Sequence, residues 1–169
     1  MQTLHMLFGP PASGKSTLAR ILVERDSVLV CPDEFRVQYP EWSANDQSLF
    51  YHIHRCVREE LSAGHDVVYD ALNTYPQWRR PIIAAGYYAH SMVIGVHLDT
   101  PLAICLERHR NREKNISQQT LTDEVITRYW EALQQYPPTL NEGFHRLLRI
   151  TPDDNPFEVL NLNRRPTIS

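Results

Sequence analysis

The chain has 169 residues, of which 42% are apolar and 22% are charged, and its formal net charge is −3. These values suit one ordinary globular domain with a single buried core and exclude a disordered chain, and no apolar run approaches the roughly 20 residues that cross a bilayer. The mild acidity argues against wide, sequence-independent binding of long nucleic acid, although it is compatible with a short basic groove for one nucleotide end.

Short apolar runs alternate with amphipathic stretches, which is the pattern of β-α-β units around a parallel sheet. In chain order, strands are predicted over residues 4–8, 28–31, 67–69, 92–98 and 144–150. Helices are predicted from residue 14, over 46–62 and 76–89, and after the expected caps Thr100, Thr122 and Asn155. The sequence therefore predicts a doubly wound α/β fold with five parallel strands in a single domain over residues 1–169. Its ligands should lie at the carboxyl ends of the strands.

Residues 9–16, Gly-Pro-Pro-Ala-Ser-Gly-Lys-Ser, match the pattern G-x-x-x-x-G-K-[ST] in full and lie between the first strand and the first helix. Glycines let backbone N–H groups curl around a phosphate, Lys15 reaches the β- and γ-phosphate oxygens, and the Ser16 hydroxyl ligates magnesium. The pattern predicts a phosphate-binding loop (P-loop) for ATP or another NTP with Mg²⁺. The residues expected to bind this cofactor here are Gly9, Ala12, Ser13, Gly14, Lys15, Ser16 and Thr17.

Kinases, motors and GTPases all use a P-loop, so the rest of the chain must separate these classes. The guanine-reading motif N-K-x-D is absent, and the chain is shorter than a typical motor core. The third strand ends in Asp70 without a following Glu, whereas hydrolases of this class need a group that positions water. A small kinase instead needs a base for the acceptor hydroxyl and a mobile lid that carries arginine. The chain offers candidates for both.

Asp33 and Arg36 follow the second strand and lie three residues apart, on one face of a first helical turn. At that edge of the sheet, Asp33 can accept the proton of an attacking hydroxyl, while Arg36 binds an anionic acceptor. The alternative is a helix N-cap at Asp33 and a solvated side chain at Arg36. The neighbouring P-loop favours the catalytic interpretation.

A lid is predicted over about residues 108–121. Arg108 and Arg112 lie four residues apart, so we expect them to share a helix face and to clamp the transferring phosphoryl group and the cofactor. A solvated basic helix end is the alternative.

Three further residues are predicted to contact the acceptor or its surroundings. Asp70 could hold a magnesium-bound water or cap its loop, and Asn73 lies just beyond it. Arg79 belongs to the segment 77–80, which could form an aromatic and basic wall of an acceptor pocket. The alternative for this segment is a solvated helix start.

These motifs occur in the same order as in the polynucleotide 5′-hydroxyl kinase group of P-loop kinases, which the chain resembles over about residues 2–150. Related members are zeta toxins, gluconate kinases and chloramphenicol phosphotransferases. The segments that carry the resemblance are 9–16, Asp33-x-x-Arg36, 70–73, 108–112 and 136–144. The resemblance implies a kinase-like sheet with strand order 2-3-1-4-5.

The resemblance also implies roles for individual residues. Asp33 would be the general base that activates the 5′-hydroxyl, and Arg36 would bind the phosphate that flanks the acceptor nucleoside. Lys15 and Arg112 would stabilise the charge on the transferring γ-phosphoryl group. One departure is Cys31, since polynucleotide kinases often have a small polar residue at that position.

The sequence leaves a choice of acceptor. A nucleic-acid 5′ end is the leading hypothesis, and a small hydroxylated metabolite, nucleoside, nucleotide-sugar or drug is the alternative, which the mild acidity supports. A non-catalytic nucleotide-binding regulator is a third class, against which the joint presence of Lys15, Ser16, Asp33 and Arg112 argues. The three scattered cysteines and the missing membrane segment favour a cytoplasmic protein.

Overall fold

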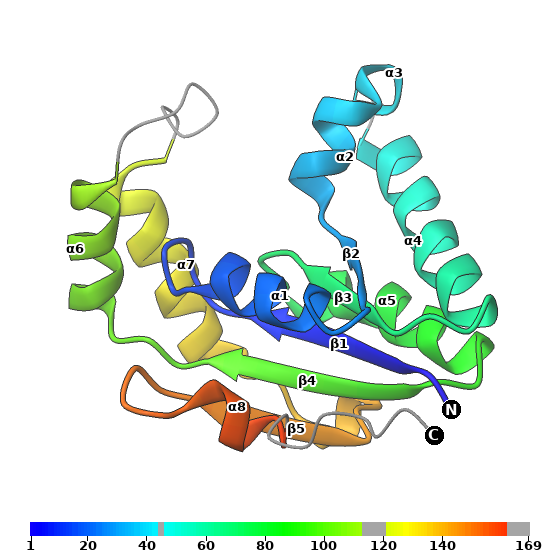
Figure 1. The fold of residues 1–169 in the computed structure, drawn as a ribbon. Coiled ribbons are helices and arrows are strands. Elements are labelled where there is room, and N and C mark those ends of the chain that lie inside the picture. Colours follow the sequence, from blue (N-terminus) through cyan, green and yellow to red (C-terminus); the bar gives the residue numbers. More distant parts are fainter. Residues whose placement is uncertain (44–45, 113–120, 162–169) are drawn as a thin grey trace.

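Five apolar runs form one parallel sheet in the computed structural model, which describes residues 1–43, 46–112 and 121–161 (Figure 1). The strands are β1 (Thr3–Phe8), β2 (Val28–Val30), β3 (Val67–Asp70), β4 (Met92–Leu98) and β5 (Arg146–Ile150). Their order is β2-β3-β1-β4-β5, and each neighbouring pair is parallel. The predicted α/β fold with strand order 2-3-1-4-5 is confirmed.

Helices connect these strands and cover the sheet. They are α1 (Lys15–Val23), α2 (Pro32–Gln38), α3 (Pro40–Ser43), α4 (Asp46–Ser62), α5 (Pro76–Tyr88), α6 (Leu102–Asn111), α7 (Asp123–Gln135) and α8 (Pro156–Val159), with a 3₁₀ helix η2 at Leu140–Glu142. Within the described ranges, none of them is both long and apolar enough to cross a membrane.

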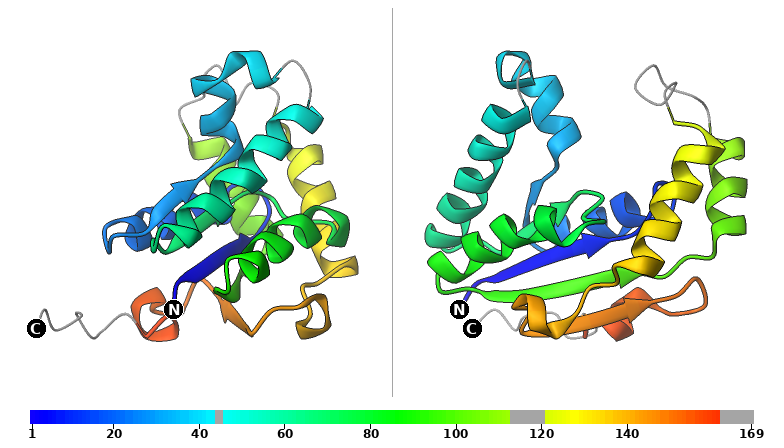
Figure 2. Two further views of the ribbon diagram at one scale, coloured as in Figure 1. Left: turned by 90° about the vertical axis from the view of Figure 1, so that its right-hand side faces the viewer. Right: turned by 180° about the vertical axis from the view of Figure 1, so that it is seen from behind.

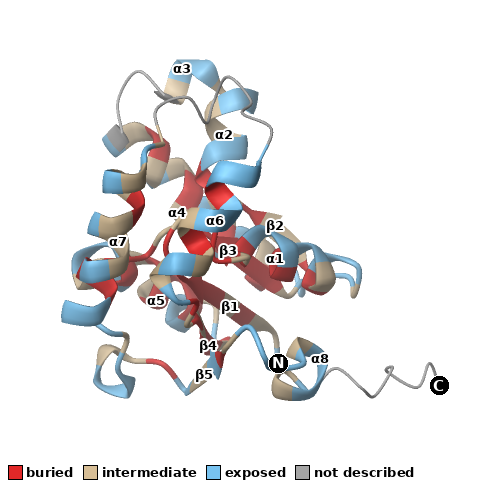
Figure 3. Cartoon of the chain, turned by 90° about the vertical axis from the view of Figure 1, so that its left-hand side faces the viewer, coloured by how far each residue is buried: buried red, intermediate tan, exposed pale blue. Residues whose placement is uncertain are grey.

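Side chains of β1 alternate between two hydrophobic cores, one on each face of the sheet. Leu4, Met6 and Phe8 pack against α4 and α5, whereas Leu7 packs against α1 and the α8 segment. This alternation is the two-residue period of a strand, and it requires both faces to be covered. Figure 3 shows the result, with buried residues concentrated on the strands and on the helix surfaces that face them.

Several predicted boundaries agree with the structure, including those of α4 and β4. The Thr122 side chain accepts a hydrogen bond from Val125 N and caps α7, as predicted, and Asn155 caps α8. The predicted cap at Thr100 is wrong, because Pro101 takes the N-cap position of α6. The Thr100 hydroxyl instead donates a hydrogen bond to Ser13 O of the P-loop.

Two groups of helices extend beyond the carboxyl edge of the sheet, on either side of the P-loop. Figure 1 shows α6 and α7 on one side and α2, α3 and α4 on the other, and the view from behind in Figure 2 shows the same arrangement. Residues 113–120 of the predicted lid lie outside the described residues. Of its described residues, 108–111 form the end of α6 and Arg112 follows this helix.

Arg79, predicted to contact the acceptor or solvent, is instead fully buried, and both interpretations of it are wrong. Its Nε donates to Asn73 O at 2.8 Å, and its Nη2 donates to Thr74 O at 2.7 Å and to Tyr136 O. Its Nη1 forms an ion pair of 2.7 Å with Glu142. The guanidinium therefore joins the loop after β3 to the end of α7 and to η2.

We expect Arg79→Met to lower the free energy of unfolding by about 3–5 kcal/mol, because the partly buried Glu142 carboxylate and three carbonyls lose their donor. The exposed neighbour Arg80 on the same helix supplies the control, and Arg80→Met should change stability by about 0.5 kcal/mol or less. Urea unfolding midpoints of the two variants measure the difference. Equal midpoints would show that Arg79 has no such structural role.

Candidate functional site

The P-loop connects the end of β1 to the start of α1, so its backbone lies at the carboxyl edge of the sheet. Gly14 has a φ of 108°, a left-handed conformation that side chains disfavour. A Cβ added at Gly9 would lie 2.4 Å from Ser13 Oγ, so only glycine fits this close approach. Ser13 Oγ is buried and has no hydrogen-bond partner in the part of the chain that the structure describes. The loop therefore has the cradle shape that its sequence predicts.

Lys15 lies across this loop. Its Nζ donates to Gly9 O at 2.7 Å and to Pro10 O at 2.9 Å, and the side chain is buried. Burial lowers the pKa of Lys15 to about 8, against the opposing attraction of the Asp70 carboxylate. A phosphate bound in the loop would give this ammonium group a negatively charged hydrogen-bond partner.

Ser16 and Asp70 place two potential metal-ligand oxygens beside Lys15. Ser16 Oγ donates to Asp70 Oδ2 at 3.0 Å, although the two residues are 54 positions apart in the chain. Burial raises the pKa of Asp70, while Lys15 and the Ser16 hydroxyl lower it. A hydroxyl and a carboxylate at this place fit a magnesium ion, which binds hard oxygen ligands and substrate phosphates. This contact favours the metal interpretation of Asp70 over a loop cap.

Two residues outside the P-loop hold it from the side of α6. Thr100 Oγ1 and Arg108 Nη1 both donate to Ser13 O, each at 2.9 Å. Thr100 O in turn accepts a hydrogen bond from Trp130 Nε1 of α7 at 3.2 Å. Thr100 was missed by sequence reasoning, and the signal was its place two residues after the end of β4, at the same edge of the sheet as the P-loop.

A cavity of about 380 Å³ opens beside the P-loop and α1. Its lining includes Gly14, Thr17, Arg108 and Arg112, together with the end of β5 at Ile150 and, after it, Thr151, Pro152 and Asp154. Arg112 does not share a helix face with Arg108, because α6 ends at residue 111 and Arg112 has an extended backbone (φ −78°, ψ 138°). The two arginines still meet at this cavity, where a nucleotide donor with its phosphates in the P-loop would place its base and ribose.

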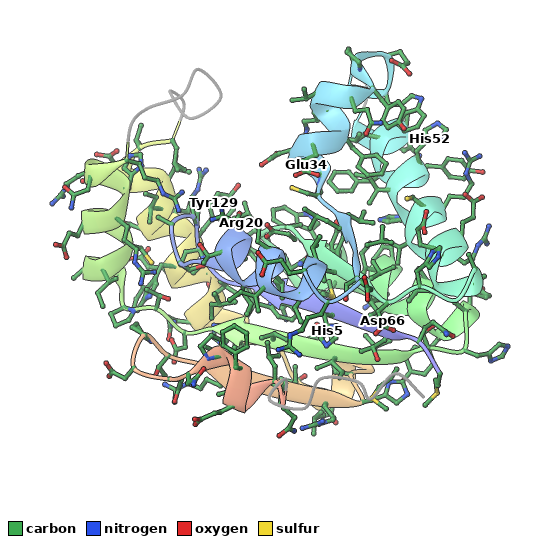
Figure 4. All side chains as sticks on the ribbon, in the orientation of Figure 1. His5, Arg20, Glu34, His52, Asp66 and Tyr129 are labelled. Carbon is green, nitrogen blue, oxygen red and sulfur yellow. The ribbon has the colours of Figure 1, made fainter. Side chains whose placement is uncertain are left out.

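A second, larger cavity of about 790 Å³ lies on the other side of the P-loop, between α2, α4, α5, α7 and the end of β3. Figure 4 labels Tyr129 on α7, which lines this cavity, and Glu34 on α2, the helix that supplies Asp33 and Arg36. Four of the five predicted acceptor residues line it, and Arg79 does not. The four are Asp33, Arg36, Asp70 and Asn73.

The acceptor residues differ in how they are held. Arg36 Nη1 forms an ion pair of 3.0 Å with Asp33 Oδ1, and the Asp33 side chain is 90% exposed. The shared face of the first helical turn is therefore confirmed. Asn73 is buried and donates from Nδ2 to Leu7 O at 2.7 Å, which fixes the loop after β3 against β1.

Comparisons with known proteins place this arrangement in a family. The family model described as an AAA domain (AAA_33) matches residues 4–136. The chain belongs to the AAA_33 family. No curated protein matches the sequence.

Solved structures similar to this AAA_33 chain share its fold at low sequence identity. A protein of Chloroflexus aurantiacus, described provisionally as a kinase, has a TM-score of 0.69 and 17% identity over 95% of this chain and 93% of that one. Kti12 of Chaetomium thermophilum, in complex with ADP-AlF₃, has a TM-score of 0.67 and 18% identity over 94% and 96%. A chain of the Pnkp1/Rnl/Hen1 RNA repair complex has a TM-score of 0.62 and 22% identity, over 79% of this chain and 44% of that one. The fold is that of P-loop kinases.

We expect this AAA_33 chain to take up protons when it binds a non-hydrolysable ATP analogue with magnesium near pH 8. About half of Lys15 is neutral at that pH, given its pKa of about 8, and phosphate charge raises the pKa of the amine. Binding should therefore add up to about half a proton per site. Calorimetric binding enthalpies in buffers of different ionisation enthalpy measure this uptake.

The same titration at pH 6 is the control, because Lys15 is then already charged in the free protein. The part of the uptake due to Lys15 should disappear. Equal uptake at the two pH values would contradict the lowered pKa of Lys15.

Proposed function

We propose that the chain is a kinase that transfers the γ-phosphate of ATP to the 5′-hydroxyl of a polynucleotide or oligonucleotide. The observation that carries this proposal is the Asp33–Arg36 ion pair, which lines the larger cavity together with Asp70. A carboxylate for the acceptor proton and a guanidinium for an acceptor anion thus lie beside the residues that would hold the donor phosphates.

The proposed reaction is an in-line displacement. The acceptor oxygen forms a bond to the γ-phosphorus while the bond from that phosphorus to the β-γ bridging oxygen breaks, and ADP leaves. Asp33 takes the proton of the acceptor hydroxyl, and Lys15 and Arg112 stabilise charge on the phosphoryl oxygens. Magnesium held by Ser16, with Asp70 nearby, would neutralise charge on the β- and γ-phosphate oxygens.

Arg36 is the residue that points to a nucleic-acid acceptor. Its guanidinium pairs with Asp33 and lies 6.0 Å from the centre of the Phe50 ring, so it stands at the acceptor cavity rather than at the donor cavity. A polynucleotide 5′ end carries a phosphate next to its terminal nucleoside, and a guanidinium suits that group. The likeness in fold to a chain of the Pnkp1/Rnl/Hen1 RNA repair complex adds support.

A small hydroxylated acceptor is the second candidate. The net charge of −3 favours it, and a cavity of about 790 Å³ is of the size that takes small molecules. Label transfer from γ-labelled ATP to a panel of 5′-hydroxyl DNA and RNA oligonucleotides, sugars and sugar acids separates the two candidates. Transfer to a sugar or sugar acid alone would discard the polynucleotide acceptor.

Asp33→Asn should lower kcat for oligonucleotide phosphorylation by about 10²–10⁴-fold, the usual contribution of a general base. Binding of the ATP analogue should stay unchanged, because Asp33 lines the acceptor cavity and not the donor cavity. The control is Glu34→Gln, which removes a neighbouring exposed carboxylate outside that lining. Full transfer activity in Asp33→Asn would remove Asp33 from the base role.

Arg36→Ala should raise KM for a nucleoside 3′-monophosphate by about tenfold or more, because a hydrogen bond to a charged group contributes about 1.5–3 kcal/mol. KM for the same nucleoside without a 3′-phosphate should change much less. Steady-state kinetics with the two matched acceptors test this. An equal rise for both acceptors would mean that Arg36 does not bind the flanking phosphate.

A further inference from the structure

The larger cavity is chemically divided. Its charged groups, Asp33, Arg36 and Asp70, come from α2 and the end of β3. Amide side chains line it on several sides, from Gln47 of α4, Asn73 of the loop after β3 and Gln77 of α5. Much of its remaining wall is aromatic and comes from three different helices. Four rings come from these helices: Phe50 and Tyr51 of α4, Trp78 of α5 and Tyr129 of α7. A fifth ring, Tyr69 of β3, belongs to the hydrophobic core.

The four rings from the helices are not explained by the hydrophobic cores. Of the four, only Phe50 packs against a core cluster, among the residues that the structure describes. Trp78 is 45% exposed and Tyr51 is 63% exposed, although both line the cavity. Large aromatic surface left open to a cavity is typical of a ligand-binding wall.

Two of the rings contact other side chains of the protein. Trp78 packs edge-to-face against Tyr75, with ring centres 4.7 Å apart and an angle of 89°, and Tyr75 contacts Tyr136. The Arg128 guanidinium lies 5.5 Å from the centre of the Tyr129 ring. Such support reduces the entropy lost when a ligand packs against these rings.

Among the described residues, the lining that α4, α5 and α7 supply includes the amides of Gln47 and Gln77 and the imidazole of His54, and no acid, lysine or arginine, so it suits a neutral group of the ligand. His54 lines the wall beside Phe50, with ring centres 6.1 Å apart, and burial lowers the pKa of its imidazole, which disfavours the charged form. A sugar or sugar acid presents many hydroxyls, each of which needs a partner when it is buried. An aromatic base instead presents two π faces, which stack on aromatic rings whatever the base.

We propose that Tyr51, Trp78 and Tyr129 line a subsite for the base of the acceptor's terminal nucleoside. This inference rests on the proposed function. The phosphoryl transfer itself needs only the acceptor hydroxyl, and the aromatic wall would bind the base next to it. Stacking carries little sequence information, so all four bases should be accepted with similar KM. The subsite requires the terminal base to leave the base stack of its own strand.

The test compares two single-stranded oligonucleotides that differ in one group. Both carry a 5′-hydroxyl, but in one the 5′-terminal residue is an abasic tetrahydrofuran analogue that keeps the sugar and the flanking phosphate. We expect the abasic acceptor to have a KM about 5–150-fold higher, the range of a base–aromatic stack. Trp78→Ala should reduce this difference, and Trp78→Phe should largely restore it.

The matched control is Tyr88→Ala, which removes an aromatic ring that is 76% exposed on the same helix and lies outside the cavity lining. It should keep the full preference for the base-bearing acceptor. Loss of that preference in Tyr88→Ala as well as in Trp78→Ala would overturn the assignment of the subsite to the cavity wall.

Binding of the same two oligonucleotides, labelled at the 3′ end and followed by fluorescence anisotropy, separates this inference from the proposed function. Equal KM and equal binding for the two acceptors would overturn the base subsite while leaving the kinase proposal intact. Base-dependent binding that Trp78→Ala abolishes, without any phosphoryl transfer, would uphold the subsite and refute the kinase proposal. If neither oligonucleotide is bound or phosphorylated, the base subsite and the kinase proposal are both overturned.

Discussion

Parallel pairing of the five strands is the constraint on which the rest of the molecule depends. It brings the carboxyl ends of all the strands to one edge of the sheet, so residues far apart in the chain become neighbours. Ser16 reaches Asp70 across 54 positions, and Thr100 reaches Ser13 across 87. Reversal of a single strand would send its terminal residues to the opposite edge and remove one side of the candidate site.

The charges at that edge are incompletely matched in the protein alone. The ammonium group of Lys15 is held by two backbone carbonyls, and burial lowers its pKa, whereas burial raises the pKa of Asp70. Opposite shifts in neighbouring groups of opposite sign indicate that both are short of solvent and of partners. A nucleotide with its metal ion would supply negative charge to Lys15 and positive charge near Asp70, so the same ligand would relieve both.

Local motifs were predictable from the sequence, and contacts between distant segments were not. The P-loop occupies eight consecutive residues, and the Asp33–Arg36 pair lies within one helical turn, so spacing alone gave their geometry. Arg79 resembles its exposed neighbour Arg80 in sequence, and its partners Tyr136 and Glu142 are 57 and 63 positions away.

Helix ends and cavity walls were also beyond the reach of sequence spacing. The four-residue interval between Arg108 and Arg112 predicted a shared helix face, but the helix ends one residue before Arg112. The aromatic wall of the larger cavity combines residues of three helices whose packing no local pattern encodes.

The net charge of −3 is compatible with a nucleic-acid acceptor if recognition is concentrated at one terminal nucleotide. Proteins that follow a long nucleic-acid backbone release many counterions, and they need a basic face for it. On the present proposal, the acceptor makes one phosphate contact, at Arg36, and draws the rest of its binding energy from stacking on the aromatic wall. A chain of this kind needs no broad basic face, and its affinity for the acceptor would depend only weakly on salt. The net negative charge of the protein would then be explained by how small a part of the acceptor it contacts. It would no longer favour a small molecule over a polynucleotide as the acceptor.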